Sequence, residues 1–326
     1  MPSTPLRRRR ALALLAAPLA GALPWPVAAQ ERPLALVLGF PPGAGIDALT
    51  RQLGERIAPA LGRPVIVENR VGAAGRLAAE HVKRTPADGS TLLVAPMAVM
   101  TIFPHTYRQL RYDPAKDFVP VAHLAEFGLA LAVRADAPAR TLQEYVEAVK
   151  RDRDMGLYGS TGVGSPSHFF ISMFERAAGV SMTHVPHRGS ADVMNALLGG
   201  HIKAAILTVN DISPQHAAGK LRALAVSAPR REATLPDVPT FKELGHDIEG
   251  SFWYGAYAPA GTPAPVVQRL SQALVEATRQ PELRAQGAKV GLQLTGGGPD
   301  VLARVQKADH DRWGPAIRAT GFVAED

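Results

Sequence analysis

The stretch LALVLGFPPGAGIDALTRQLGERIAPALGRPVIVEN, residues 34–69, decides how the fold begins. Residues 34–38 form a short apolar run that is typical of a buried strand. Five apolar residues then recur at three- and four-residue spacing, which marks one face of a helix: Ile46, Leu49, Leu53, Ile57 and Leu61. Gly62 and Pro64 end this helix, and residues 65–67 form the next strand. The pattern predicts an α/β fold in which helices cover both faces of a parallel sheet.

The alternation continues along the chain. Strands are expected at 91–94, 129–133, 182–185, 204–207 and 223–226, and helices at 77–82, 142–149, from Pro166 onward, around 193–198, at 263–279 and at 299–319. The length allows two lobes, yet no low-complexity linker divides the chain. We therefore expect the chain to cross between lobes on structured segments, near 129–134 and 252–258. The expected division is 30–130 plus 256–326 for the first lobe and 131–255 for the second.

The first 29 residues have the pattern of a secretory signal peptide. Four arginines, Arg7 to Arg10, precede an apolar run at 11–23, and small residues follow at 27–29. The run is too short for a lasting membrane span, so we expect cleavage after Ala29 and a periplasmic mature protein. The arginines leave export by the Sec or the twin-arginine route open.

Removing this segment lowers the formal net charge from +7 to +3, because its four arginines are its only charges. The remaining basic residues are scattered, which argues against a nucleic-acid partner. The chain contains no cysteine. Disulfide scaffolds, cysteine zinc sites and thiol nucleophiles are therefore excluded.

The first segment with binding chemistry is the loop at 39–47, between the first strand and helix. Its glycines permit close backbone approach, and the free N–H groups at a helix start favour an anion. Asp47 is expected to cap the helix or to accept a hydrogen bond from the ligand. The ligand-binding residues expected in this loop are Phe40, Pro41, Gly43, Ala44, Gly45 and Asp47.

Two other interpretations of this loop stay open. Gly43-x-Gly45-x-x-Ala48, with Glu68 at the end of the next strand, matches a dinucleotide fingerprint. Export and the two preceding prolines disfavour that interpretation, and we expect no cofactor. A tight turn without a ligand is the other alternative.

The second such segment is Tyr158-Gly-Ser-Thr-Gly-Val-Gly-Ser165, followed by Pro166, Ser167 and His168. Ser165 is a favourable N-cap and Pro166 fits the first helical turn. Backbone N–H groups and hydroxyls at such a helix start suit a carboxylate. The ligand-binding residues expected here are Ser160, Thr161, Gly164, Ser165 and His168. A capped helix after a glycine-rich turn, with no ligand, is the alternative.

Catalytic and metal sites are disfavoured. No Gly-x-Ser-x-Gly elbow is present, and no nucleophile, base and orienting group occur together, so we expect no enzyme activity. A secreted hydrolase that uses Ser160 or His168 is kept as a less favoured alternative. His184-x-x-His187 lies at a strand end without an acidic or cysteine partner, so we expect no metal and a structural role for His184.

The chain resembles the Bug receptors, the extracytoplasmic solute receptors of tripartite tricarboxylate transporters. The resemblance covers nearly all the mature chain and rests on motifs that recur in order: Phe40-Pro-Pro-Gly-x-Gly-x-Asp47, Val67-Glu-Asn-Arg-x-Gly-x-x-Gly75, Asp88-Gly-x-Thr-Leu-Leu93, Tyr112-Asp-Pro-x-x-Asp-Phe118, Tyr158-Gly-Ser-x-Gly-x-Gly-Ser165 with His168, His184-Val-Pro186, Gly219-Lys-Leu-Arg-Ala-Leu-Ala225, Leu235-Pro-Asp-Val-Pro-Thr240 and Ala258-Pro-Ala-Gly-Thr-Pro263.

The resemblance implies a two-domain periplasmic-binding-protein fold of type II character, with two lobes joined by crossover strands around a ligand cleft. It implies a carboxylate ligand held by the two loops and delivery to membrane permease subunits. We expect a monomer that closes over the solute by a hinge motion. Many members of the family have no adjacent permease. A receptor that signals to a sensor protein is therefore an alternative.

Two departures from the family pattern bear on the ligand. Residues 95–100 read Ala-Pro-Met-Ala-Val-Met where relatives often carry a polar run, and 205–210 read Ala-Ile-Leu-Thr-Val-Asn where many carry an aspartate. Met97, Ala98 and Thr208 are expected to line the ligand site at these places. We hypothesise a ligand with one carboxylate and an apolar or aromatic body, or a small dicarboxylate without an amino group, rather than aspartate or citrate.

Overall fold

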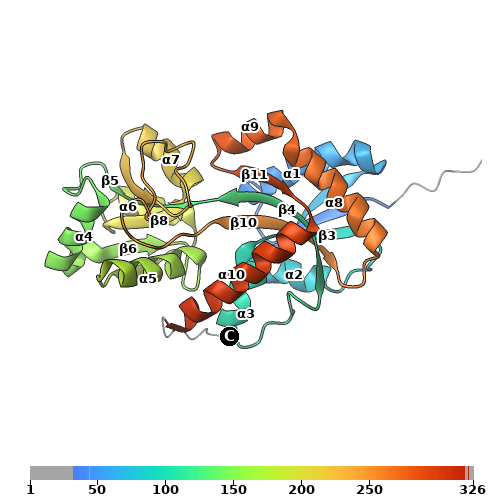
Figure 1. Ribbon diagram of the computed structural model, residues 1–326, viewed down its shortest axis with the longest axis horizontal. Helices are drawn as coiled ribbons and strands as arrows, with labels where there is room; N and C mark the ends of the chain where they lie inside the picture. The colour runs from blue at the N-terminus through green and yellow to red at the C-terminus, as the bar shows by residue number, and fades with distance from the viewer. Residues whose placement is uncertain (1–31, 44, 320–321, 323–326) are drawn as a thin grey trace, which may run out of the picture. The chain divides into compact units, whose positions relative to one another are not determined.

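A computed structural model describes residues 32–43, 45–319 and 322, which form two β-sheets with surrounding helices (Figure 1). The α/β class expected from the sequence is confirmed. The signal-peptide prediction for residues 1–29 lies outside the described residues. Within the described part of the chain, no helix is long and apolar enough to cross a membrane.

The first sheet has six strands in the order β11-β4-β10-β3-β1-β2. β1 pairs in parallel with β2 and β3, whereas β10 runs antiparallel to β3 and β4, and β11 antiparallel to β4. The strands are β1 (Leu34–Leu38), β2 (Val65–Asn69), β3 (Thr91–Pro96), β4 (Phe118–Phe127), β10 (Phe252–Pro259) and β11 (Gln293–Gly297).

The second sheet has five strands in the order β7-β6-β8-β5-β9. β6 is parallel to β7 and β8, and β5 is antiparallel to β8 and β9. The strands are β5 (Leu129–Arg134), β6 (Leu157–Ser160), β7 (Thr183–Pro186), β8 (Ala204–Thr208) and β9 (Leu221–Val226).

The expectation of a parallel sheet is corrected, because both sheets also contain antiparallel pairs. Strands joined by a crossover helix run parallel, whereas a strand that passes from one sheet to the other is free of that constraint. β4 continues into β5 with only Gly128 between them, and β10 returns to the first sheet after β9. These connecting strands are the ones that pair antiparallel.

Ten helices of α type surround the sheets in the described chain. The predicted helices appear, and α1 runs through Pro59 to Leu61. Sequence reasoning missed α3, α7 and α9. The helices are α1 (Gly45–Leu61), α2 (Arg76–Val82), α3 (Phe103–Thr106), α4 (Leu142–Arg151), α5 (Pro166–Ala178), α6 (Ser190–Leu198), α7 (Val209–Ala217), α8 (Ala264–Arg279), α9 (Pro281–Lys289) and α10 (Pro299–Ala319), with short turns η1 (Ala73–Gly75), η2 (Ala98–Ile102) and η3 (Arg153–Gly156).

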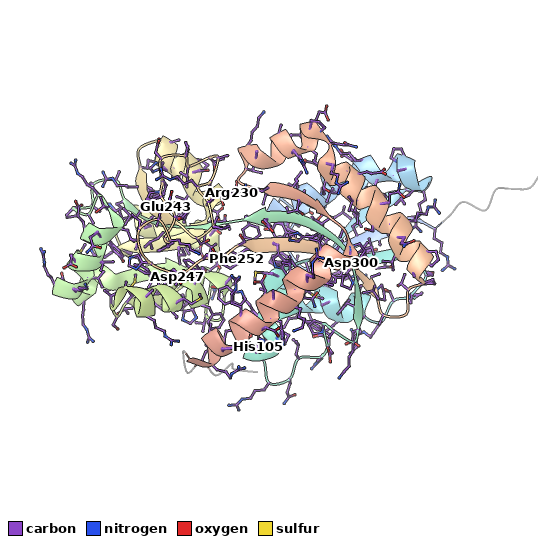
Figure 2. All side chains as sticks on the ribbon, viewed as in Figure 1. His105, Arg230, Glu243, Asp247, Phe252 and Asp300 are labelled. Atoms are coloured by element: carbon purple, nitrogen blue, oxygen red, sulfur yellow. The ribbon has the colours of Figure 1, made fainter. Side chains whose placement is uncertain are left out.

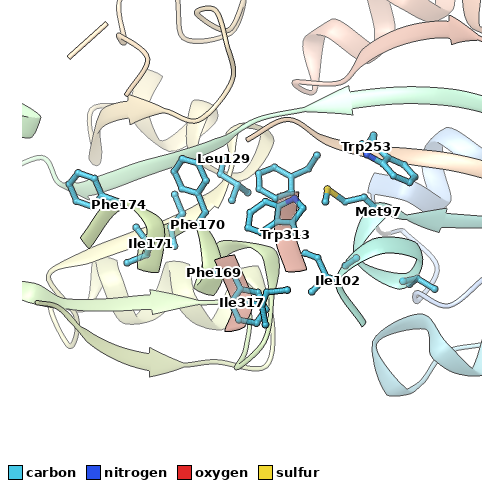
Figure 3. Packing of buried hydrophobic residues seen from close by; sticks show 14 of the residues in the cluster. Met97, Ile102, Leu129, Phe169, Phe170, Ile171, Phe174, Trp253, Trp313 and Ile317 are labelled. Carbon is cyan, nitrogen blue, oxygen red and sulfur yellow. The ribbon is translucent and has the colours of Figure 1, made fainter. Parts of the chain in front are cut away.

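Helix α10 follows β11 of the first sheet in sequence but also packs against a helix of the second. It contacts β4 and η2 as well as α5. Its Trp313 is fully buried in a core cluster that includes Phe170 from α5 and Trp253 from β10 (Figure 3). Burying aromatic groups from both sheets in one cluster stabilises their contact.

The Ser227 hydroxyl forms hydrogen bonds with both segments where the chain crosses between the sheets. It accepts a hydrogen bond from Leu129 N (2.9 Å) at the β4–β5 crossing and donates to Gly250 O (2.7 Å) just before β10. The expected crossings at 129–134 and 252–258 correspond to strands β5 and β10 themselves, so the junctions lie immediately before both of these segments.

We expect Ser227→Ala to lower the free energy of unfolding by about 2–4 kcal/mol, since it leaves a buried N–H and a buried carbonyl without a partner. Urea denaturation measures this. Ser172→Ala is the control, because that hydroxyl only bonds its own helix at His168 O; a change of about 0.5 kcal/mol or less is expected there. Equal effects of the two variants would contradict the role of Ser227.

A candidate solute site between the two sheets

A cavity of about 100 Å³ lies where strands of both sheets end. β3 of the first sheet and β6 and β8 of the second all end at it, which is the usual position of ligand sites in open α/β sheets. The lining residues are Pro96, Met97, Ala98, Phe127, Leu129, Thr161, Pro166, Ser167, Leu207, Thr208 and Phe252.

Three helical segments begin at this cavity. Met97 and Ala98 start η2, which continues directly into α3; Pro166 and Ser167 start α5; and Thr208 caps α7. The first N–H groups of a helix lack intrahelical acceptors and carry partial positive charge, so they attract anions. The backbone N–H of Ser167 has no acceptor among the described residues.

Hydroxyls supply the polar side chains of the wall, and no lining residue carries a charge. Thr161 Oγ1 and Ser167 Oγ lie 3.5 Å apart. Thr208 differs from them, because its hydroxyl donates to Asp211 Oδ2 (2.8 Å) and accepts from Asp211 N (3.3 Å). Thr161 and Ser167 are therefore the hydroxyls best placed to donate to an anion in the cavity.

The rest of the wall is apolar and comes from both sheets. The rings of Phe127 and Phe252 lie 6.0 Å apart where β4 ends and β10 begins, and Figure 2 labels Phe252 at this central place. Leu129 and Leu207 complete the wall from the second sheet. Sequence reasoning missed these four residues, because apolar residues of connecting strands look like ordinary core.

The loop at 39–47 lies behind the cavity wall. Phe40, Pro41, Gly43 and Gly45 do not line the cavity, and Ala44 lies outside the described residues. A Cβ on Gly75 would meet the ring of Phe40 at 3.3 Å and Val99 of η2 at 3.2 Å. The contact runs from the loop through Gly75 to η2, so the loop supports the wall.

Asp47 also has a supporting position. The residue is 2% exposed; Oδ2 accepts from Gly43 N (2.9 Å) and Arg51 Nε (3.0 Å), and Oδ1 accepts from Asn69 Nδ2 (2.8 Å). Burial alone would raise the pKa of Asp47, but these hydrogen bonds hold it below its ordinary value. Because its donors all come from the chain, we assign Asp47 to ordering the loop and not to contacting solute.

We expect Asp47→Ala to reduce stability by about 2–4 kcal/mol at neutral pH, because it removes three hydrogen bonds that order the loop. The depressed pKa means that this contribution is present above the ordinary pKa of aspartate and is lost as pH falls through the lower, folded-state value. Urea unfolding at several pH values measures both effects. An equal deficit at neutral and strongly acidic pH would contradict the assignment.

In the second loop, Thr161 lines the cavity while its neighbours hold the loop in shape. Ser160 is fully buried, and its Oγ lies 2.6 Å from His184 Nε2. Ser165 caps α5 by accepting from His168 N (3.3 Å), and His168 Nδ1 accepts from Gly164 N (3.1 Å). The site therefore brings together Met97, Ala98, Thr161 and Thr208 from the predicted set.

The arrangement gives no support to a hydrolase. Ser160 is close to a histidine but has no exposed surface. No carboxylate forms a hydrogen bond with His184 among the described residues. The same part of the chain contains no group of three side chains able to hold a metal ion.

The two mixed β-sheets are joined by connecting strands, and a small cavity suited to an anion lies at their strand ends. This arrangement defines the class of two-lobed periplasmic binding proteins. Within this class, the chain belongs to the tripartite tricarboxylate transporter receptor family, whose model matches residues 49–322. The resemblance seen in the sequence is thereby confirmed.

Solved structures agree with this assignment. The chain is similar to Rpa4515 of R. palustris, determined with adipate (28% identity, TM-score 0.82, covering 90% of this chain and 99% of that one). It is similar to MatC of Rhodopseudomonas palustris with bound malate (30%, 0.77, 88% and 99%) and to the periplasmic binding protein BugD (30%, 0.79, 90% and 99%). The two-lobed fold is thus confirmed.

Proposed function

We propose that this chain is a periplasmic receptor that binds one small carboxylate in the cavity between its two sheets and performs no chemistry on it. The observation that carries this proposal is the convergence of α5 and α7 helix starts, together with the Thr161 and Ser167 hydroxyls, on a cavity without charged side chains. Malate and adipate in two similar structures support the choice of ligand class.

The apolar stretch 95–100 can contribute to carboxylate binding through its backbone. Its side chains are apolar, but Met97 and Ala98 begin the helical segment formed by η2 and α3, and the first N–H groups of such a segment lack intrahelical acceptors. The site can therefore bind a carboxylate without polar side chains there. The expected solute has one carboxylate on an apolar or aromatic body, or is a small dicarboxylate. Without a carboxylate in the wall, an ammonium group would have no counter-charge.

The wider setting is part of the proposal. The chain is expected to lose residues 1–29 on export, to act as a monomer, and to close around the junctions fastened by Ser227. The family description supports delivery to membrane permease subunits. A receptor that presents its closed form to a sensor protein would use the same site, and a neighbouring permease or sensor gene distinguishes the two.

A thermal-shift screen tests the proposal. The chain without residues 1–29 is heated with adipate, malate, benzoate, aspartate or citrate. We expect adipate, malate or benzoate to raise the melting temperature, since ligand binding stabilises the native state, and chromatography to recover the solute unchanged. A selective shift with aspartate or citrate alone would contradict the ligand class, and turnover of the solute would favour the hydrolase.

Gly164→Val is expected to weaken binding of the solute found in that screen by about tenfold or more. Gly164 has φ +74°, which valine rarely adopts, and a Cβ there would lie 3.1 Å from the ring of Phe322. The loop that presents Thr161 must therefore shift. Isothermal titration calorimetry measures the change.

Gly179→Val is the matched control, because Gly179 also has positive φ (+63°) but no atom within 4 Å of its Cβ position. It should lose stability and keep its affinity. Unchanged affinity in Gly164→Val would remove this loop from the site.

A further inference from the structure

Two histidines stack beneath the loop that presents Thr161. The rings of His168 and His184 are 4.2 Å apart and inclined by 12°. Tyr158 stacks on His184 at 5.0 Å, and Phe169 and Phe322 contact the ring of His168. Neither histidine lines the cavity.

The hydrogen bond from Gly164 N–H fixes the state of His168. A backbone N–H can only donate, so the Nδ1 atom that accepts it at 3.1 Å carries no proton. The ring is then neutral, with its proton on Nε2. Protonating His168 would place a second donor against Gly164 N–H and break this contact.

Hydroxyls connect the second ring to the cavity. His184 Nε2 lies 2.6 Å from Ser160 Oγ, which lies 3.5 Å from Ser165 Oγ. Ser165 Oγ lies 3.0 Å from Ser167 Oγ, and Ser167 lines the cavity beside Thr161. Ser160 Oγ also donates to Gly162 O at 3.2 Å. If His184 donates from Nε2, the Ser160 hydrogen stays on Gly162 O, and the hydroxyls of Ser165 and Ser167 keep their hydrogens for donation outward. The last hydroxyls then donate to a carboxylate, whereas the opposite tautomer would turn their lone pairs toward it.

We propose that His168 and His184 are positioning residues of the solute site. As a neutral stacked pair, both with the proton on Nε2, they hold loop 160–167 with its hydroxyls directed at the cavity. Protonation of the pair releases the solute. The release of solute rests on the proposed function, because that function supplies the ligand. The ordering of loop 160–167 by the two histidines does not depend on a ligand.

The surroundings of the rings oppose protonation. Burial lowers the pKa of His168, and burial with the neighbouring His168 and His187 lowers the pKa of His184 to about 4. The groups facing the pair are the aromatic rings of Tyr158, Phe169 and Phe322 and the imidazole of His187. The charge of Glu175 helps to raise the pKa of Tyr158 but does not contribute to the pKa shift of His168 or His184. With depressed pKa values, the ordered loop is favoured above the ordinary histidine pKa. It loses stability as pH falls toward the lower values.

Hydrogen exchange of the loop amides tests this without a ligand. The chain without residues 1–29 is compared at about pH 7.5 and about pH 4.5, with rates corrected for intrinsic exchange. In the wild type, protection of the hydrogen-bonded amides of Gly162, Gly164 and Ser165 should fall about tenfold or more on acidification. His168→Phe keeps a ring in the stack but cannot accept from Gly164, so its loop should be unprotected at both pH values.

His168→Gln should behave oppositely, because its side-chain carbonyl can accept the Gly164 N–H without titrating. Its loop should be protected at neutral pH and should resist acid. His105→Phe is the control: His105 also lies against another histidine ring, His310 at 4.2 Å, but among the described residues it has no hydrogen bond or ring contact with the loop, whose exchange should not change. Nitrogen-15 NMR should show both His168 and His184 with the proton on Nε2 at neutral pH.

Equal protection in the wild type and His168→Phe, or a proton on Nδ1 of His168, would overturn the proposal. Adipate titration at both pH values separates this result from failure of the proposed function. If the loop responds to acid as expected but adipate does not bind to the wild type, the choice of ligand is at fault. If adipate binds equally well at both pH values, the role of the pair in solute release is refuted.

Discussion

Ala98→Phe is expected to abolish binding of the carboxylate that stabilises the wild type, with affinity lowered about 100-fold or more. Ala98 lies at the start of η2, is 7% exposed and lines a cavity of only about 100 Å³. A phenylalanine ring directed into that space would occupy the position of the solute. Isothermal titration calorimetry measures the loss.

The fold should tolerate this change, because the ring enters empty space and not a filled core. The free energy of unfolding should fall by no more than about 1–3 kcal/mol. Ala48→Phe, on the exposed face of α1, is the control for added hydrophobic surface and should bind normally. Normal binding by Ala98→Phe, with its melting temperature preserved, would place the solute somewhere other than this cavity.

Gly39→Ala is expected to lower the free energy of unfolding by about 3 kcal/mol or more. A Cβ on Gly39 would lie 2.2 Å from Gly75 Cα. The clashing atoms belong to the backbone on both sides, so no flexible side chain can move aside. The loop at 39–47 and the turn at η1 would have to separate, which removes the support behind η2.

Urea denaturation of Gly39→Ala should therefore show a large shift of the midpoint, and the weakened support should also reduce solute affinity. Gly45→Ala is a close control from the same loop, because no atom lies within 4 Å of its Cβ position and its φ is ordinary. Its stability should stay within about 0.5 kcal/mol of the wild type. A similarly small effect of Gly39→Ala would show that the two loops are not in close contact.

Elements with clear apolar periodicity could be predicted from the sequence. The helix expected at 299–319 matches α10, and the strand at 34–38 matches β1. β4 was missed although it has ten residues, since Pro120, His123 and Glu126 interrupt its apolar pattern. His123 is nevertheless buried, and burial lowers its pKa to about 4. Tertiary packing therefore decides this strand.

The residues of the site could be predicted only in part, because tertiary packing also decides which residues reach the cavity. The glycine-rich loop before a helix marked Thr161, and the family resemblance marked Ala98 and Thr208, but local sequence could not show that Phe127 and Phe252 meet across the connecting strands. It also could not separate residues that line the cavity from those that support it, such as Asp47 and Ser160, because both kinds share the same loops. Ser167 was recoverable in principle, because it follows Pro166 in the first turn of a predicted helix.

The most direct measurement is a crystal structure of the chain without residues 1–29 in complex with the carboxylate that gives the largest thermal shift. We predict that one carboxylate oxygen lies about 2.7–3.2 Å from Ser167 N or the Thr161 hydroxyl, with the body of the solute between Phe127, Phe252 and Leu207. A solute bound elsewhere, for example in the groove lined by Arg108, Arg111 and Lys307, with the cavity between the sheets empty, would contradict the central claim.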